Sequence, residues 1–142
     1  MKVRDAMTKE VKVAREDSTI EYVANEMKNL NIGSIPVCDI NNKLLGIVTD
    51  RDIVVRGLSQ GKGGNYTIKD VMTTNPVSVS PETSIHEATD IMSQNQIRRL
   101  PVVDNGTLVG ILAIGDVAVR DNFIDQAGDA LSSISEPSKP NM

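Results

Sequence analysis

Residues 34–52 read SIPVCDINNKLLGIVTDRD, and residues 99–116 read RLPVVDNGTLVGILAIGD. Both stretches contain an apolar run with Pro-Val, a polar turn, and a Gly followed by two apolar residues and, six places after the Gly, an Asp. The similarity extends outward, because residues 3–53 recur as residues 68–117 at a nearly constant spacing of 65 or 64 residues. The sequence therefore predicts a duplicated small domain and not an array of short repeats.

Each copy predicts the order strand, helix, strand, strand, helix. Apolar residues at helical spacing, from Ile20 to Met27 in the first copy, indicate an amphipathic helix, and Ser18 with Glu21 is typical of a capping box. Polar turn residues between the two apolar runs of each copy predict a hairpin. A second helix is expected to begin near Asp50, and its copy from Gly115 is expected to run on towards Leu131.

The predicted fold class is α/β (α+β), with two β-α-β-β-α repeats packed as a pseudo-two-fold pair. A unit this small buries little apolar surface alone. Two units that share a core would bury more surface and stabilise each other. We expect repeat 1 in residues 1–60, a Gly-rich linker in 61–66, repeat 2 with a C-terminal helix in 67–131, and a flexible tail in 132–142.

Composition narrows the function. The 142 residues include 39% hydrophobic and 2% aromatic residues and carry a formal net charge of −4, which disfavours nucleic acid as a partner. No apolar run is long enough to span a membrane, and no secretory segment follows Met1, so we expect a soluble cytoplasmic protein without membrane contact.

The sequence contains few residues of the types that commonly catalyse reactions or bind metals. Cys38 is the only cysteine and His86 the only histidine, so an intrachain disulfide cannot form, and a zinc site or a catalytic triad would have to use one imidazole. We expect Cys38 to be a core residue and His86 to be a solvated helix residue. The prediction is a protein that is not an enzyme, has no catalytic or metal-binding residues, and requires no cofactor.

Two repeats with an h-P-V-x-D strand (Ile35–Asp39 and Leu100–Asp104) and a G-h-h-x-x-x-D segment (Gly46–Asp52 and Gly110–Asp116) resemble a tandem pair of cystathionine-β-synthase (CBS) domains, the Bateman module. The resemblance covers residues 3 to about 120 and is closest to small stand-alone bacterial CBS-pair proteins. It implies a regulatory module that binds adenosine-containing ligands in clefts between the repeats.

Thr49 and Asp52 are candidates for the ligand site on chemical grounds. They lie three residues apart where a strand passes into a helix, so a hydroxyl and a carboxylate can both face a ligand. A carboxylate suits the paired hydroxyls of a ribose, and a helix N-terminus favours a nearby phosphate. The alternative is that Thr49 caps the helix and Asp52 stabilises its dipole. In the family, the ribose-binding acid stands at the position of Asp52.

Arg98 and Arg99 are the other informative pair, because the first copy has Gly33 and Ser34 at the equivalent place. The resemblance implies that a basic pair here contacts the phosphates of a nucleotide whose ribose is held by the acid of the other repeat. A solvated surface pair is the alternative. The adenine is expected against aliphatic walls formed by Ile47, Pro76 and Val77, whose alternative role is ordinary core packing.

The second cleft, with Ser34, Ile111 and Asp116, is expected to be weaker. The Ser or Thr usual in the family is Ala113 here, and the first copy supplies no basic pair. The residues do not distinguish AMP, ADP, ATP and other adenosine ligands.

We expect an adenine-nucleotide sensor that acts in trans on an unidentified protein. The alternatives are an interaction or scaffold module without a nucleotide, or a sensor of S-adenosylmethionine. A homodimer is also expected, through an apolar face around Ile53, Val54, Val117 and Val119.

Overall fold

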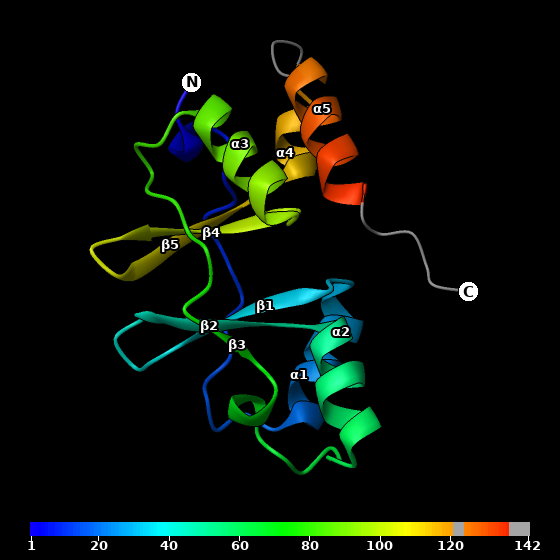
Figure 1. Cartoon of the computed structure of the whole chain (residues 1–142). Helices are drawn as coiled ribbons and strands as arrows, with labels where there is room; N and C mark the ends of the chain where they lie inside the picture. The colour runs from blue at the N-terminus through cyan, green and yellow to red at the C-terminus, as the bar shows by residue number, and fades with distance from the viewer. Residues whose placement is uncertain (121–123, 137–142) are drawn as a thin grey trace. The chain divides into compact units, whose positions relative to one another are not determined.

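The computed structural model describes residues 1–120 and 124–136, and its helices and strands confirm the mixed α+β class. The chain divides into two compact units, which are drawn together in Figure 1. The one called here the α1 unit comprises Lys12–Pro76 with Gly106–Leu108, and the other, the α3 unit, comprises Met1–Val11, Val77–Asn105 and the chain from Val109 on. The unit boundaries therefore differ from the repeat boundaries in the sequence.

The α1 unit contains one hairpin, one long helix and several short helical segments. Its strands and first helix are α1 (Ile20–Leu30), β1 (Ser34–Cys38), β2 (Leu44–Thr49) and β3 (Thr73–Thr74). Its other helical segments are α2 (Asp50–Asp52), the π-helical η2 (Ile53–Gly57), and the 3-10 turns η3 (Leu58–Gln60) and η4 (Ile68–Asp70). The expected second helix of repeat 1 thus begins at Asp50 as predicted, and it changes its hydrogen-bond pattern after one turn.

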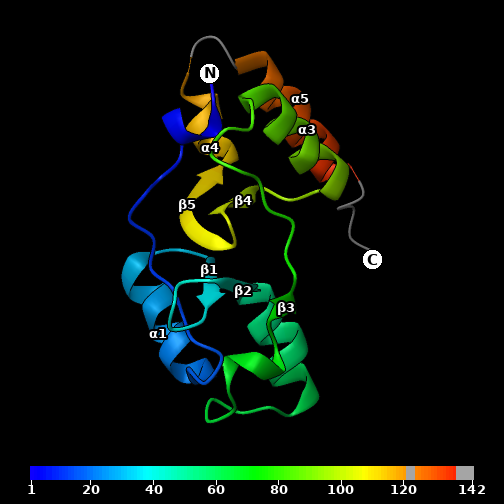
Figure 2. The same cartoon turned by 90° about the vertical axis from the view of Figure 1, so that its left-hand side faces the viewer.

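The α3 unit repeats this plan and adds a terminal helix. Its elements are the 3-10 turn η1 (Val3–Asp5), α3 (Ile85–Asn95), β4 (Arg99–Asp104), β5 (Thr107–Ala113), α4 (Ile114–Ala118) and α5 (Ile124–Ser135). The first two residues of β5 fall in the α1 unit. Figure 2 shows α3 and α5 next to each other over the β4–β5 hairpin.

The opening segment of each repeat pairs with the hairpin of the other repeat. In the α1 unit, β3 comes from the start of repeat 2 and pairs antiparallel with β2, placing Thr73 opposite Ile47. In the α3 unit, Thr8 from the start of repeat 1 exchanges backbone hydrogen bonds of 2.9 and 3.0 Å with Ile111 of β5. Each unit therefore needs chain from both repeats, although each hairpin is local as predicted.

Two glycines allow the opening segments to pair this closely with β2 and β5. A Cβ on Gly46 would lie 2.6 Å from the carbonyl oxygen of Thr73, and a Cβ on Gly110 would lie 2.8 Å from that of Thr8. Contacts this short do not occur for real Cβ atoms, so any side chain at these positions would displace the crossing backbone. This steric constraint explains why both copies carry a Gly at this strand position.

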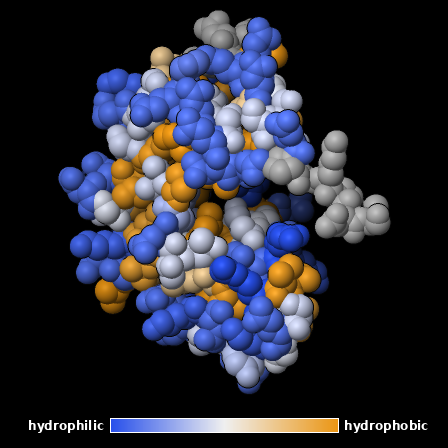
Figure 3. Space-filling model, in the orientation of Figure 1, coloured by the Kyte–Doolittle hydropathy of each residue, from blue (hydrophilic) through white to orange (hydrophobic). Residues whose placement is uncertain are grey.

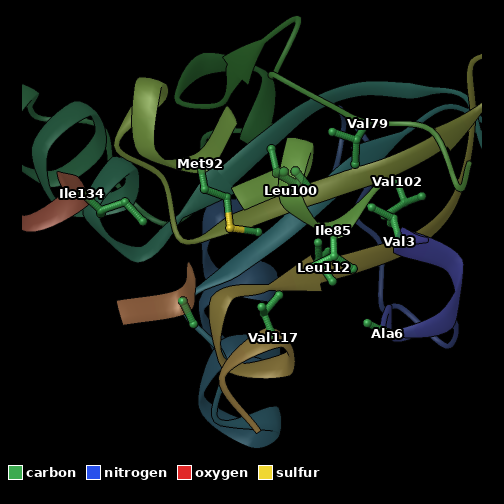
Figure 4. Close-up of a cluster of buried hydrophobic side chains, with 12 residues drawn as sticks. Val3, Ala6, Val79, Ile85, Met92, Leu100, Val102, Leu112, Val117 and Ile134 are labelled. Carbon is green, nitrogen blue, oxygen red and sulfur yellow. The ribbon is translucent and has the colours of Figure 1, made fainter. Parts of the chain in front are cut away.

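Each unit has its own hydrophobic core. In the α3 unit, Figure 4 shows side chains from η1, α3, both strands and α4 directed towards one another. Met92, Leu100 and Leu112 have no exposed surface there. In the α1 unit, Val23, Val37 and Val48 are equally buried. Cys38 is fully buried, which confirms its predicted core position, and burial raises the pKa of its thiol, with Arg15 opposing and Asp39 adding to the shift.

The ends of the elements differ from expectation in several places. Thr19 caps α1 by accepting from the backbone N–H of Tyr22, so the predicted cap at Ser18 is wrong by one residue. The first strand expected in each copy is much reduced: in repeat 1 it consists of isolated bridges, one joining Ala14 to Val37, and in repeat 2 it includes the two-residue strand β3. These differences arise because caps and short bridges are decided by tertiary contacts and not by propensity alone.

The C-terminal part also needs correction. The helix expected to run from Gly115 towards Leu131 ends at Ala118, and α5 is a separate helix that continues to Ser135. Residues 132–135, expected in a flexible tail, form the last turn of α5, because Ala127, Ala130 and Ile134 bury one face of this helix. The expected tail residues 137–142 lie outside the described residues. Within the described residues, no helix is both long and apolar enough to cross a bilayer.

Replacing Gly110 by Ala should lower the free energy of unfolding by about 1–3 kcal/mol, because the added methyl group displaces the Thr8 segment. The matched control is Gly128→Ala in α5, where a Cβ meets no atom within 4 Å. That change should raise the free energy of unfolding by about 0.5–1 kcal/mol through helix propensity. Urea denaturation of both variants provides the comparison, and destabilisation of the same size in both would contradict the steric argument.

Candidate functional site

Thr49 and Asp52 form a reciprocal cap where β2 passes into α2. The backbone N–H of Asp52 donates to Thr49 Oγ1 at 3.1 Å, and the backbone N–H of Thr49 donates to Asp52 Oδ2 at 3.0 Å. Both residues are half-buried. The capping role that the sequence left as an alternative is therefore present in the structure.

Capping does not exhaust the hydrogen-bonding capacity of this pair. The Thr49 hydroxyl accepts in the cap, so its own proton is available for donation. Within the described part of the chain, Asp52 Oδ1 has no hydrogen-bond partner, and a carboxylate oxygen can accept more than one bond. The pair can thus hold the helix end and still offer one donor and several acceptor sites to a ligand.

The second repeat builds a reduced version of the same cap. The backbone N–H of Ala113 donates to Asp116 Oδ2 at 2.9 Å, which reproduces the carboxylate half of the arrangement. Ala113 has no hydroxyl, so the side-chain acceptor for the backbone N–H at the third helical position is missing. Ile111, two residues earlier on β5, is half-buried. This end of β5 offers a carboxylate without an adjacent hydroxyl donor.

Arg98 and Arg99 lie at the start of β4 in the α3 unit. Arg98 precedes the strand and Arg99 is its first residue, and both side chains are exposed. The carbonyl of Arg98 accepts a 2.8 Å bond from the backbone N–H of Ile114, the first residue of α4. In the α1 unit, Gly33 takes the place of Arg98, with a 2.9 Å bond from Asp50. Because Arg98 lies outside the strand, strict strand alternation does not force the two guanidinium groups to opposite faces.

The residues expected to contact adenine are partly assembled in the α1 unit. Ile47 is half-buried on β2, and β3 runs beside it before the chain reaches the half-buried Pro76. Val77 is 37% exposed and belongs to the α3 unit. Ser34, expected in the second cleft, is half-buried and lies opposite Thr49 in the β1–β2 register.

The structure thus brings together Thr49, Asp52 and Ile47 within the α1 unit, with Ser34 beside Thr49. Within the α3 unit it places the Arg98 backbone next to the α4 N-terminus that Asp116 caps. The convergence of Asp52 with Arg98 and Arg99 in one cleft stays a prediction.

His86 lies on the surface of α3, with partners on α3 and α5. The His86 side chain is 67% exposed, its Nε2 lies 3.6 Å from Asp90 Oδ2, and its Nδ1 lies 2.7 Å from Gln126 Nε2. No group of three metal-ligating side chains occurs within residues 1–120 and 124–136. The partner of His86 on α5 is a long-range contact that no sequence pattern signalled.

The expected dimer face is altered by the structure. Ile53 and Val117 are buried core residues and cannot contribute to a docking face. Val54 and Val119 are exposed. A homodimer stays a prediction, and the exposed apolar residues now available to it in the α1 unit include Val55 and Leu58.

These features place the chain in a known class. The sequence model of the CBS domain matches residues 3–58 and 68–120, more than half of the chain. The protein therefore belongs to the CBS domain family, as the motifs in both repeats predicted.

Individual relatives agree with this assignment. The chain is 44% identical over 133 residues to the CBS domain-containing protein YhcV of Bacillus subtilis (strain 168), covering 94% of each. The structure of CBSX2 in complex with AMP matches with a TM-score of 0.75 at 28% identity, over 82% of this chain and 92% of that chain. The CBS domain pair of MJ0100, in complex with 5-methylthioadenosine and S-adenosyl-L-methionine, matches with a TM-score of 0.75 at 29% identity, over 83% and 93%.

The difference between the two caps can be measured. Thr49→Ala should lower the free energy of unfolding by about 0.5–2 kcal/mol, because it removes the acceptor for the Asp52 N–H. The reciprocal change Ala113→Thr should raise it by a similar amount, since Ala113 already has extended backbone angles suited to an N-cap. Denaturant titrations of both variants test the pair. Unchanged midpoints would show that the Thr49 hydroxyl does not stabilise the helix.

Proposed function

We propose that the protein is a regulatory module that binds an adenine nucleotide between its two CBS repeats and acts in trans on another protein. The observation that carries the proposal is the Thr49–Asp52 cap, which keeps a hydroxyl proton and a carboxylate oxygen available at the end of β2. The AMP complex of a structural neighbour supports an adenosine-containing ligand. Binding in this proposal involves no chemical turnover of the ligand.

Each part of the nucleotide has a chemical counterpart among the residues. Asp52 would accept from the ribose hydroxyls, and Thr49 would donate to a phosphate oxygen. Ile47, Pro76 and Val77 would provide apolar surface for the adenine. Arg98 and Arg99 would contact the phosphates through charge-assisted hydrogen bonds, which are stronger than neutral ones.

The two clefts are proposed to be unequal. The first has a hydroxyl, a carboxylate and a basic pair. The second, with Ser34, Ile111 and Asp116, lacks both the threonine hydroxyl and the arginines. We therefore propose one tight nucleotide site in each chain.

A phosphate-free adenosine ligand is the second candidate. The MJ0100 complex contains 5-methylthioadenosine and S-adenosyl-L-methionine, so neighbours of this fold accommodate adenosine without a phosphate. A scaffold role without a nucleotide makes the opposite prediction, since no adenosine ligand would then stabilise the fold.

A thermal-shift panel with AMP, ADP, ATP, adenosine and S-adenosylmethionine tests the proposal. A ligand at about 100 times its Kd adds about 2.7 kcal/mol to the free energy of unfolding, which raises the Tm by several degrees. Asp52→Asn should abolish most of this rise, because it replaces the charged acceptor and keeps an oxygen for the cap. Asp116→Asn is the matched control and should retain it. Equal losses in both variants would contradict the proposed asymmetry, and a flat panel would exclude the adenosine site.

The arginine pair makes a separate prediction. The double variant Arg98→Ala/Arg99→Ala should weaken nucleotide binding by roughly tenfold to a hundredfold, since each lost charge-assisted bond is worth about 1.5–3 kcal/mol. Binding of adenosine should change little. Calorimetry should compare this variant with Lys28→Ala/Lys69→Ala, which removes the same charge from exposed positions. If nucleotide and adenosine lost affinity by the same factor, the arginines would not be contacting phosphate.

A further inference from the structure

A polar pocket lies between α3 and α5, both within the α3 unit. Figures 1 and 2 show the two helices side by side. The Nδ1 of His86 on α3 accepts from Nε2 of Gln126 on α5 at 2.7 Å, which ties the helices together. The pocket is partly open to solvent and has a volume of about 340 Å³. It is lined by His86, Thr89, Asp90, Ser93, Gln94, Gln126, Asp129, Ala130 and Ser133.

The charge of this region is one-sided. The lining contains two carboxylates, those of Asp90 and Asp129, and no Lys or Arg. The sequences of α3 and α5 add two further acids, Glu87 and Asp125, and again contain no Lys or Arg. Figure 3 shows hydrophilic residues over much of the visible surface of these helices. The carboxylates of both helices would therefore attract a cation near the pocket, and neither helix has a basic side chain that would repel it.

One buried hydrogen-bond acceptor in the pocket has no donor among the described residues. Gln126 uses its Nε2 for His86, and its Oε1 is buried with no hydrogen-bond partner among the described residues. The hydroxyl of the buried Thr89 is already used, because it donates to the carbonyl of His86 at 2.9 Å. A buried acceptor without a donor is unfavourable, and a ligand that carries N–H groups would satisfy it.

A bare divalent metal ion is a poor match to these residues. No group of three metal-ligating side chains occurs in the described part of the chain, and the one His–Asp pair, 3.6 Å apart, lies on a single helix turn. A ligand that is larger than an ion and carries several N–H donors would fill the pocket. It would also donate hydrogen bonds to the carboxylates and to the amide oxygen of Gln126.

We propose that the α3–α5 pocket binds a small organic cation that carries ammonium or guanidinium groups. Asp90 and Asp129 supply the charge from facing helices, and Gln126 Oε1 accepts one N–H. The occupant is independent of the adenosine ligand, since none of these residues belongs to the nucleotide site proposed above. Because the pocket joins the terminal helix to α3, an occupant would also hold α5 in place.

The chain offers a single-residue reporter for this site. His86 is the only histidine, so a tag-free protein gives one set of imidazole signals in NMR spectra. Titration with agmatine, which carries a guanidinium and an ammonium group, and with putrescine should shift these signals in a saturable manner at constant pH and ionic strength. The same titration with butanol, which lacks the charge, should leave them unchanged.

Two double variants that remove the same charge distinguish binding in the pocket from nonspecific electrostatic attraction to the two helices. Asp90→Asn/Asp129→Asn removes the two lining carboxylates, and Glu87→Gln/Asp125→Gln removes two exposed carboxylates on the same helices outside the lining. The first should weaken agmatine binding by about tenfold or more, and the second by less than about threefold.

Equal losses in the two variants would overturn the proposal, as would the absence of a saturable shift with the wild-type protein at 10 mM of each probe, taken as about the weakest useful affinity. Circular dichroism spectra of both variants should match that of the wild-type protein, so that a loss of binding is not a loss of folding. Intact nucleotide binding in the first variant would show that the cation site and the nucleotide site are separate.

Discussion

The close approach of two backbone segments at Gly46 and Gly110 is the constraint on which this structure depends. A neighbouring backbone segment pairs with β2 and with β5 so closely at these glycines that a Cβ would lie 2.6–2.8 Å from a carbonyl oxygen. The paired segment in each case belongs to the other repeat. Hence each sheet is completed by chain from the other repeat, and the two repeats form their sheets together.

The same constraint positions the candidate site. Gly46 allows the close antiparallel pairing of β3 with β2, and three residues later β2 ends at Thr49, where the carboxylate of Asp52 closes the cap. Gly110 stands in the same relation to Ala113 and Asp116. In each repeat, the glycine allows the close backbone approach, and the aspartate six residues later provides the carboxylate at the strand end. The two strand ends differ in one hydroxyl, and this difference, together with the arginine pair present in only one repeat, underlies the proposed asymmetry of binding.

The sequence predicted the elements that depend on interactions between residues close together in the chain. The apolar spacing from Ile20 to Met27 predicted α1, and the turn residues predicted both hairpins. The exchange of opening segments could not be predicted, because pairing between residues as distant as Thr8 and Ile111 leaves no periodic signal. The division between α4 and α5 was missed for a related reason, since apolar spacing shows that a helix is amphipathic and not where it breaks. The candidate site residues were predicted from motifs, whereas the His86–Gln126 contact has no motif.

Calorimetric titration of the wild-type protein with the best nucleotide tests the central claim most directly, because the number of tight sites reflects the difference between the two strand ends. One complete set of a hydroxyl, a carboxylate and a basic pair predicts a stoichiometry of one tightly bound nucleotide per chain. Two sites of equal affinity, or none, would contradict the account.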